Sequence, residues 1–155
     1  MKALAAKVGR RLKRKRGLLV TAESCTGGWV SQAVTAVGGS SDWFDRGFVT
    51  YSNAAKQQML GVKASTLKLH GAVSEETARE MAKGALRRSR GTIAVAVTGV
   101  AGPTGGTAAK PVGMVCFSWT TKQRQWSETR RFRGNRENVR RQSVSHALKG
   151  VLKRG

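Results

Sequence analysis

The sequence predicts an α/β fold built on a sheet that is partly parallel and partly antiparallel. Short apolar runs typical of buried strands alternate along the chain with segments that have the spacing of amphipathic helices. The last two expected strands, residues 113–119 and 125–132, flank a short polar turn, and only antiparallel neighbours can be joined in this way. No repeat or long linker divides the 155 residues, so we expect residues 1–155 to form one domain.

The first half of the chain is expected to contribute three helices and two strands. An apolar stripe of Leu4, Val8 and Leu12 predicts the first helix, while Ser52 and Gly61 are the expected caps of the third. The predicted helices cover residues 2–16, 26–37 and 52–60, and the predicted strands cover residues 17–23 and 42–51, the second with a turn or bulge near Gly47.

The second half begins with a polar connector that contains His70. Ser74, followed by two acidic residues, predicts the start of a helix over residues 74–86. The expected order continues with a buried strand over residues 92–99 and a glycine-rich loop over residues 99–113. It ends with the strand pair described above and an amphipathic helix over residues 135–152.

The charge is strongly unbalanced. The chain has 29 Lys and Arg residues against 8 Asp and Glu, a formal net charge of +21, and basic residues cluster in segments 10–16 and 130–142. Three interpretations remain open: a solvated surface, a nucleic-acid-binding surface, or steering of a small anionic substrate. Aromatic residues do not interleave with the basic clusters, and no helix-turn-helix, zinc-finger or RNA-binding motif is visible, which disfavours nucleic acid as the main partner.

Several classes of protein are disfavoured by what the sequence lacks. No apolar run reaches the roughly 18 residues of a membrane span, and the basic N-terminal segment has no secretory core, so we expect a cytoplasmic protein without a membrane partner. Cys25 and Cys116 lack the spacing of metal ligands or of a redox pair, and a reducing compartment suits them. We expect no metal and no cofactor.

Two side chains that can act as nucleophiles lie at one expected strand-to-helix turn. Ser24 and Cys25 are adjacent in the stretch "TAESCTGG", where glycines let a substrate approach the backbone. Main-chain N–H groups around Thr26 and Gly27 can stabilise an oxyanion there. From these residues alone, it is equally plausible that Ser24 and Thr26 only cap the following helix and that Cys25 is a small core residue.

A serine nucleophile needs a base, and the histidines are poor candidates. Neither His70 nor His146 has an evident Asp partner, so a Ser-His-Asp triad is unsupported. A lysine can act as the base when burial lowers its pKa. Lys56 lies about one helical turn after Tyr51, the only tyrosine, although a surface lysine and a packed tyrosine would have the same spacing.

Two further segments have features of an anion site. The glycine-rich stretch from Thr98 to Gly106, which includes Gly102, follows a strand and offers main-chain N–H groups, but it lacks the lysine of a phosphate-binding P-loop. Arg136 and Arg140 are four residues apart on one face of the last helix and suit a phosphate or a carboxylate. A flexible loop and a solvated basic face are the plainer alternatives.

Together these motifs resemble the family of CinA C-terminal domains, the nicotinamide-nucleotide amidohydrolases of PncC type. The resemblance covers about residues 5–152 and is carried, in order, by "TAESCTGGWVSQAVT", "GSSDWFDRGFVTYSNAAKQQMLGV", "HGAVSEETAREMAKGAL", "AVAVTGVAGPTGG", "KPVG" and "FRGNRENVRRQSVSHAL". It implies a three-layer α/β/α domain with a mixed sheet. It also implies hydrolysis of the carboxamide of nicotinamide mononucleotide to ammonia and nicotinate mononucleotide, which returns to NAD synthesis.

The resemblance assigns roles to individual residues. The family's catalytic serine, tyrosine and lysine fall on Ser24, Tyr51 and Lys56. For substrate binding we expect the lining to include Thr98 and Gly102, main-chain groups at Thr26 and Gly27, and an arginine, Arg136 in preference to Arg140. Members of the family often form dimers or larger oligomers, so we expect a homo-oligomer, a dimer in preference; the chain resembles the stand-alone form without an additional N-terminal domain. The basic excess and the acid-free stretch "TGGTAAKP" depart from the family pattern. The alternative is a protein of the same fold without deamidase activity that binds nucleic acid or another partner through its basic surface.

Overall fold

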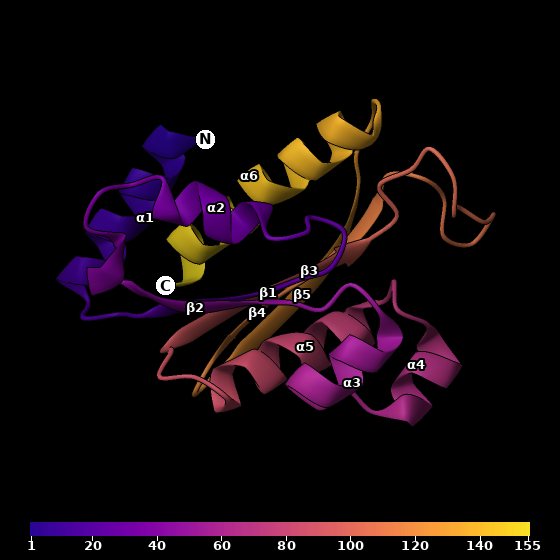
Figure 1. Ribbon diagram of the computed structural model, residues 1–155, viewed down its shortest axis with the longest axis horizontal. Coiled ribbons are helices and arrows are strands. Elements are labelled where there is room, and N and C mark those ends of the chain that lie inside the picture. The colour runs from indigo at the N-terminus through magenta and orange to yellow at the C-terminus, as the bar shows by residue number, and fades with distance from the viewer.

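A twisted sheet of five strands lies between two layers of helices (Figure 1). The computed structural model describes residues 1–155. Helices α1, α2 and α6 cover one face of the sheet, and α3, α4 and α5 cover the other. The expected three-layer α/β/α architecture is confirmed.

The elements follow the predicted order with two additions, a 3₁₀ turn before the second strand and a helix over residues 64–70. Their bounds are α1 Lys2–Arg14, β1 Leu19–Glu23, α2 Trp29–Thr35, a 3₁₀ turn Ser40–Asp42, β2 Phe44–Val49, α3 Asn53–Leu60, α4 Ala64–His70, α5 Glu75–Arg87, β3 Ile93–Gly99, β4 Met114–Thr121, β5 Gln125–Arg131 and α6 Arg136–Arg154. None of these helices is both long and apolar enough to cross a membrane.

The sheet is mixed, as the sequence predicts. Its strand order is β2-β1-β3-β4-β5, with β1 parallel to both β2 and β3, and with β4 antiparallel to β3 and β5. The register aligns Glu23, at the end of β1, with Val49 on β2 and Val97 on β3. The segments that follow these strands therefore meet at one edge of the sheet.

Alternation along the central strands builds two cores of different size. Odd-numbered residues of β3, such as Val95, join the larger core under α1, α2 and α6, which also holds the buried Trp43. Even-numbered ones, such as Ala96, join the smaller core under α3 and α5. The small alanine side chains on this second face let α5 pack close to the sheet.

Helix ends follow the predicted capping residues. Ser52 Oγ accepts the Ala55 N–H at 3.0 Å, and Ser74 Oγ accepts the Thr77 N–H at 3.1 Å. Gly61 ends α3 in the left-handed region at φ +70°, which a glycine adopts without steric cost. These caps fix the start of α3, and with it the place of Lys56.

Two expectations about local structure are wrong. The second helix begins at Trp29 instead of residue 26, because Gly27 and Gly28 have positive φ and residues before them form a turn. The connector that contains His70 is a helix, α4. The irregularity expected in β2 near Gly47 is confirmed, because the register with β1 shifts at Asp45, two residues before that glycine.

Candidate active site

Ser24 lies in a tight turn at the edge of the sheet where the parallel strands end. This Ser24 turn, residues 24–28, connects β1 to α2 and contains two consecutive glycines in the left-handed region, Gly27 at φ +60° and Gly28 at φ +94°. L-amino acids with a Cβ rarely adopt such a conformation, so the glycines permit the sharp reversal. Ligands of open α/β sheets commonly bind at this edge.

The buried carboxylate of Glu23 fixes the Ser24 turn through hydrogen bonds. Glu23 is the last residue of β1 and is 0% exposed. Its two oxygens accept five hydrogen bonds, at 2.7–3.1 Å, from donors in the turn and in the first residues of α2. The donors are Thr26 Oγ1, the amides of Gly28, Val30 and Ser31, and Ser31 Oγ. The carboxylate thus caps the amides at the start of α2, where a negative charge is favoured, and fixes the path of the chain around Ser24.

The structure brings Ser24 and Lys56 together. Lys56 Nζ lies 3.0 Å from Ser24 Oγ, and it donates a hydrogen bond to the Thr50 carbonyl oxygen at 2.8 Å. Two features create this contact between residues 32 positions apart: the parallel pairing of β1 with β2, and the Thr50 N–H bond to the Glu23 carbonyl at 2.8 Å. The expected nucleophile and the expected base are therefore within proton-transfer distance.

Lys56 is buried without a carboxylate partner. Only 1% of the residue is exposed, and none of the ion pairs includes it. Burial lowers the pKa of the Lys56 amine, because a charged ammonium loses solvation there, while the nearby Cys25 opposes this shift. A neutral amine in this place donates one N–H to the Thr50 carbonyl and keeps a lone pair for the Ser24 hydroxyl.

Cys25 is poorly suited to be the nucleophile. It is buried and belongs to the larger core. Burial raises the pKa of the Cys25 thiol to about 12, with a smaller contribution in the same direction from Glu23, against the lowering effects of its own backbone N–H, Arg140 and Lys56. The thiol is therefore protonated at neutral pH, and the thiolate that would attack a substrate is scarce.

Main-chain amides of the Ser24 turn differ in whether they are already used. Gly27 N–H donates to the Ser24 carbonyl at 3.0 Å, and Ser24 N–H donates to the Val97 carbonyl at 2.9 Å. The amide of Thr26 donates to no protein acceptor, and that of Cys25 donates to no other residue. Of the N–H groups expected to hold an oxyanion, that of Thr26 is free and that of Gly27 is not.

Arg140 holds the outer side of the same turn. Its Nε donates to the Cys25 carbonyl at 3.1 Å and its Nη2 donates to the Thr26 carbonyl at 2.9 Å. The guanidinium lies 5.2 Å from the centre of the Trp29 ring, a cation–π distance. Arg140 thereby ties α6 to the Ser24 turn.

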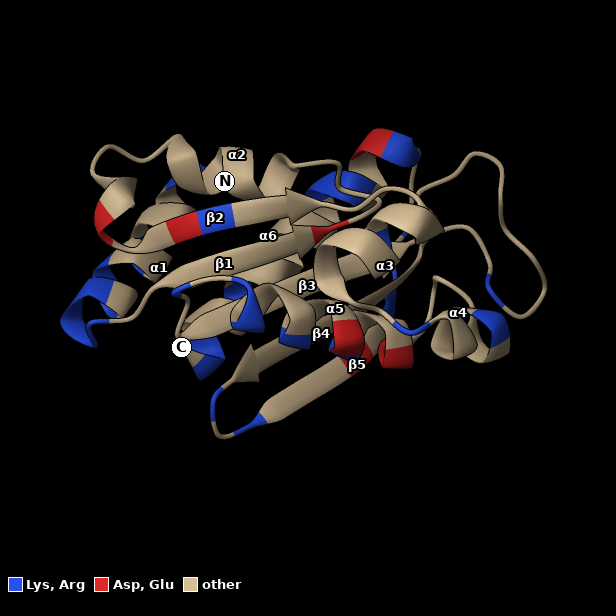
Figure 2. Ribbon diagram, turned by 60° about the horizontal axis from the view of Figure 1, so that its bottom comes forward, with Lys and Arg blue, Asp and Glu red and all other residues tan.

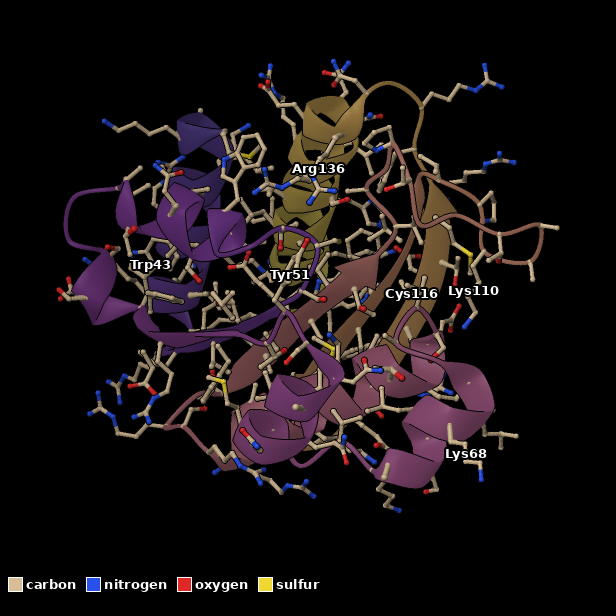
Figure 3. The ribbon with its side chains drawn as sticks, turned by 45° about the vertical axis from the view of Figure 1, so that its right-hand side comes forward. Trp43, Tyr51, Lys68, Lys110, Cys116 and Arg136 are labelled. Atoms are coloured by element: carbon tan, nitrogen blue, oxygen red, sulfur yellow. The ribbon has the colours of Figure 1, made fainter.

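Tyr51 and Arg136 form a second pair at the mouth of the site. Arg136 Nη2 donates to the Tyr51 hydroxyl at 3.2 Å, and Nη1 donates to the Gly102 carbonyl at 2.7 Å. Figure 3 shows the two side chains approaching one another from the segment after β2 and from the start of α6. Tyr51 is 64% exposed, and no hydrogen bond joins it to Ser24 or Lys56. The expected Lys-Tyr pair is not directly bonded.

The other expected binding side chains have partners within the protein. Thr26 Oγ1 donates to Glu23 at 2.7 Å, and Thr98 Oγ1 donates to the Ala72 carbonyl at 2.8 Å. Both residues are buried. Thr98 connects the end of β3 to the segment before α5, and through the register of β3 it lies beside the Ser24 turn.

Neither histidine contacts Ser24. His146 pairs with Glu128 on β5, under the aromatic side chains of Phe117 and Trp119. His70 Nδ1 lies 3.9 Å from Glu76. No group of three or more His, Cys, Asp or Glu side chains is arranged to hold a metal ion.

Sequence reasoning missed Glu23 and Thr50. Glu23 is a lone acid at the end of an apolar strand, directly before two candidate nucleophiles, and this position was the available signal. Thr50 contributes its carbonyl through the backbone, which no side-chain pattern reveals. Thr50 Oγ1 is itself buried without a hydrogen-bond partner.

Comparison with known proteins identifies the family of the chain. The model of the family described as "CinA C-terminal domain" matches residues 1–154. The chain is 51% identical to nicotinamide-nucleotide amidohydrolase PncC of Escherichia coli (strain K12), over 94% of this chain and 88% of that protein. It is 51% identical to the protein of the same name from Pseudomonas putida, over 98% of this chain and 95% of that protein.

A solved structure has the same fold. The crystal structure of competence/damage inducible protein CihA from Agrobacterium tumefaciens superposes with a TM-score of 0.96 at 44% identity, covering 98% of this chain and 93% of that one. Family model, identity and fold lead to one conclusion: the chain belongs to the CinA C-terminal domain family.

Proposed function

We propose that this chain is an amidohydrolase that converts nicotinamide mononucleotide and water to nicotinate mononucleotide and ammonia. One observation carries the proposal: a buried lysine without a carboxylate partner lies 3.0 Å from the hydroxyl of Ser24, in a turn at the ligand-binding edge of the sheet. The names of the relatives from Escherichia coli and Pseudomonas putida support an amide of a nicotinamide nucleotide as the substrate.

In the proposed first step, neutral Lys56 takes the proton of Ser24 as Oγ attacks the carboxamide carbon. The Thr50 carbonyl orients the amine for this transfer, because it accepts one N–H at 2.8 Å and leaves the lone pair directed to Ser24. The amides of Cys25 and Thr26 are the donors we assign to the oxyanion, since neither donates to another residue.

Collapse of the tetrahedral intermediate breaks the carbon–nitrogen bond. Protonated Lys56 returns its proton to the leaving nitrogen, which departs as ammonia and leaves an ester on Ser24. Water, deprotonated by Lys56, then hydrolyses this ester, so that nicotinate mononucleotide is released and Ser24 regains its proton. We assign Tyr51, five residues before Lys56, to assist Lys56 in these proton transfers. Its hydroxyl is positioned by the hydrogen bond that it accepts from Arg136.

The substrate phosphate is assigned to the mouth of the site. Arg136 lies between Tyr51 and the glycine-rich loop that contains Gly102, and its planar guanidinium suits a phosphate. The large net positive charge favours the approach of an anionic nucleotide, an effect that salt weakens.

Replacement of Cys25 by Ala should leave most of the activity. The thiol is protonated at neutral pH and buried, so the change removes only a small core side chain. We expect kcat within about threefold of wild type, since no interaction with the reacting atoms is lost. Initial rates of ammonia release measure it. Complete loss of activity in a folded variant would instead identify Cys25 as the nucleophile.

Arg140 is proposed to position the oxyanion donors rather than to bind substrate. In a planar trans peptide the C=O and the next N–H point in opposite directions. By holding the Cys25 carbonyl at 3.1 Å, Arg140 keeps the Thr26 N–H directed to the other side of that peptide. Its Nη2 simultaneously fixes the following carbonyl, that of Thr26.

Arg140→Lys should therefore lower kcat and leave KM almost unchanged. A lysine retains the charge but cannot hold two carbonyls with one planar fork. We expect kcat to fall about 30-fold, less than the roughly 10²–10³-fold loss that follows complete removal of an oxyanion donor. Steady-state kinetics with nicotinamide mononucleotide separate the roles. A large rise in KM at constant kcat would show that Arg140 binds the substrate.

The proposed function is tested by incubating the purified protein with nicotinamide mononucleotide and quantifying ammonia and nicotinate mononucleotide. Equal amounts of both products, absent with Ser24→Ala, are the expected result. A folded wild-type protein that releases neither product would overturn the proposal.

A further inference from the structure

A row of three adjoining pockets crosses the end of the molecule opposite the Ser24 turn. Neighbouring pockets share Lys122 or Lys15 in their walls, and their volumes are about 540, 280 and 530 Å³. They lie where β1 and β3 begin and where β4 turns into β5. We call this row the basic groove, after the lysine and arginine side chains that line it: Arg11, Lys15, Lys83, Arg87, Arg90, Lys122, Arg124, Lys153 and Arg154.

Most of the positive charge in the groove has no acidic partner in the protein. None of the eight acidic residues of the chain lines the groove. Arg90 forms an ion pair with Asp45 at 3.1 Å, and Arg11 and Lys15 donate to a main-chain oxygen of Gly155, the last residue, at 2.8 and 2.9 Å. The other six basic residues of the groove have no acidic partner. Figure 2 shows these blue segments gathered at one end, on the last turn of α1, beside the C terminus, before β3 and at the turn between β4 and β5. Like charges held so close repel one another, and a bound polyanion relieves that repulsion.

The shape of the groove favours a chain of phosphates over one small anion. Each pocket is near the size of a small-ligand site, and the three continue into one another across α5, the sheet edge and α6. Trp126 lines the pocket beside α6, where Arg154 lies 5.8 Å from the centre of its ring. Lysine and arginine side chains along a path, with an aromatic ring beside it, are typical of surfaces that follow a nucleic-acid backbone.

We propose that the basic groove binds the phosphodiester backbone of single-stranded nucleic acid, independently of the amidohydrolase site. The five residues of β1, roughly 16 Å of strand, separate the groove from Ser24. Occupation of the groove therefore leaves access to the Ser24 turn unobstructed. The binding is tolerant of base sequence, because its main contacts are to phosphate groups.

The test compares two double variants that change the net charge by the same amount. Lys15→Glu with Lys122→Glu alters the two lysines that each line two of the three pockets. Lys2→Glu with Lys68→Glu alters two exposed lysines outside the groove, at the start of α1 and on α4, where Figure 3 shows Lys68. Fluorescence anisotropy measures the affinity for a labelled single-stranded oligonucleotide of about 20 nucleotides over a series of salt concentrations.

The groove variant should bind at least about tenfold more weakly than wild type, and the slope of log K against log salt concentration should become shallower by about 1.4, the value for two lost phosphate contacts. The control variant should stay within about twofold. The proposal would be overturned by equal weakening in both variants or by absence of binding to wild type at low salt. It would also be overturned if polyglutamate of matched charge competed for the protein as well as an unlabelled oligonucleotide does. Both variants should keep the wild-type kcat for nicotinamide mononucleotide, so this test fails or succeeds separately from the amidohydrolase proposal.

Discussion

Lys56→Met is expected to reduce kcat by roughly 10³-fold, the range for loss of a general base. The amine at 3.0 Å from Ser24 is the only basic side-chain nitrogen hydrogen-bonded to that hydroxyl, so no neighbour replaces it. Methionine has a similar length and no proton acceptor of comparable strength. Rates of ammonia release by wild type and variant, measured at saturating substrate, give the ratio. A variant with more than about a tenth of the wild-type kcat would exclude Lys56 as the base.

The same substitution should not unfold the protein. Burial of an unpaired lysine is unfavourable, and an apolar side chain of similar volume removes that cost, although the Thr50 carbonyl loses its donor. We therefore expect thermal unfolding within a few degrees of wild type, which separates loss of chemistry from loss of fold. Lys63→Met, at an exposed position next to α4, is the matched control and should keep full activity.

The pH dependence follows from the lowered pKa of Lys56. Activity requires the neutral amine, so kcat/KM should rise with pH to a plateau, with an apparent pKa below the ordinary value of 10.5. In the folded protein the pKa is lowered, so the unfolded chain binds more protons between the two pKa values, and the free energy of unfolding rises with pH in that window. Lys56→Met lacks this dependence; its stability relative to wild type should be greatest at low pH and decline toward pH 10.5.

Glu23→Gln is expected to lower the free energy of unfolding by about 3 kcal/mol, because one carboxylate oxygen that accepts hydrogen bonds is replaced by an amide that donates them. The carboxylate is fully buried and accepts five hydrogen bonds, so at least two donors lose their acceptor. For a chain of this size the change corresponds to a fall in Tm of about 6–12 °C. Chemical unfolding of both proteins measures it.

Activity of Glu23→Gln should also fall when the protein is still folded. The turn that presents Ser24 and the amides of Cys25 and Thr26 loses its anchor, so kcat should decrease more than KM changes. Glu137→Gln is the control: this exposed acid pairs only with Arg141 on α6, and its loss should cost less than about 0.5 kcal/mol. Equal stability losses in the two variants would contradict the role given to Glu23.

Much of the fold is visible in the sequence because local and tertiary preferences agree. Buried runs such as residues 92–99 form strands. Ser52 and Ser74 begin helices and Gly61 ends one, as these residue types predict. Helix α4 was missed because its start has no side-chain cap. Instead Glu80, from α5, accepts the Lys63 N–H at 2.8 Å and the Thr66 hydroxyl at 2.7 Å.

The site was only partly predictable from its residues. Ser24 stands out by its glycine-rich turn, but its contact with Lys56 depends on the register of β1 and β2, which the sequence does not specify. Family resemblance, not periodicity, selected Lys56 among the lysines. The roles of Glu23 and Arg140 in holding the turn depend on tertiary structure. Glu23 acts as a fully buried acid, and Arg140 contacts residues that precede it by more than a hundred positions.

The most direct measurement is the mass of the protein quenched during turnover of nicotinamide mononucleotide. Covalent catalysis by Ser24 predicts a species heavier than the free protein by the nicotinate mononucleotide acyl group, with the added mass on the peptide that contains Ser24. This species should be absent from Ser24→Ala and persist in Cys25→Ala. Turnover with the acyl group on Cys25 would contradict a Ser24 nucleophile activated by Lys56. Turnover without any acylated protein, under conditions in which hydrolysis of the acyl-enzyme is slow, would contradict it as well.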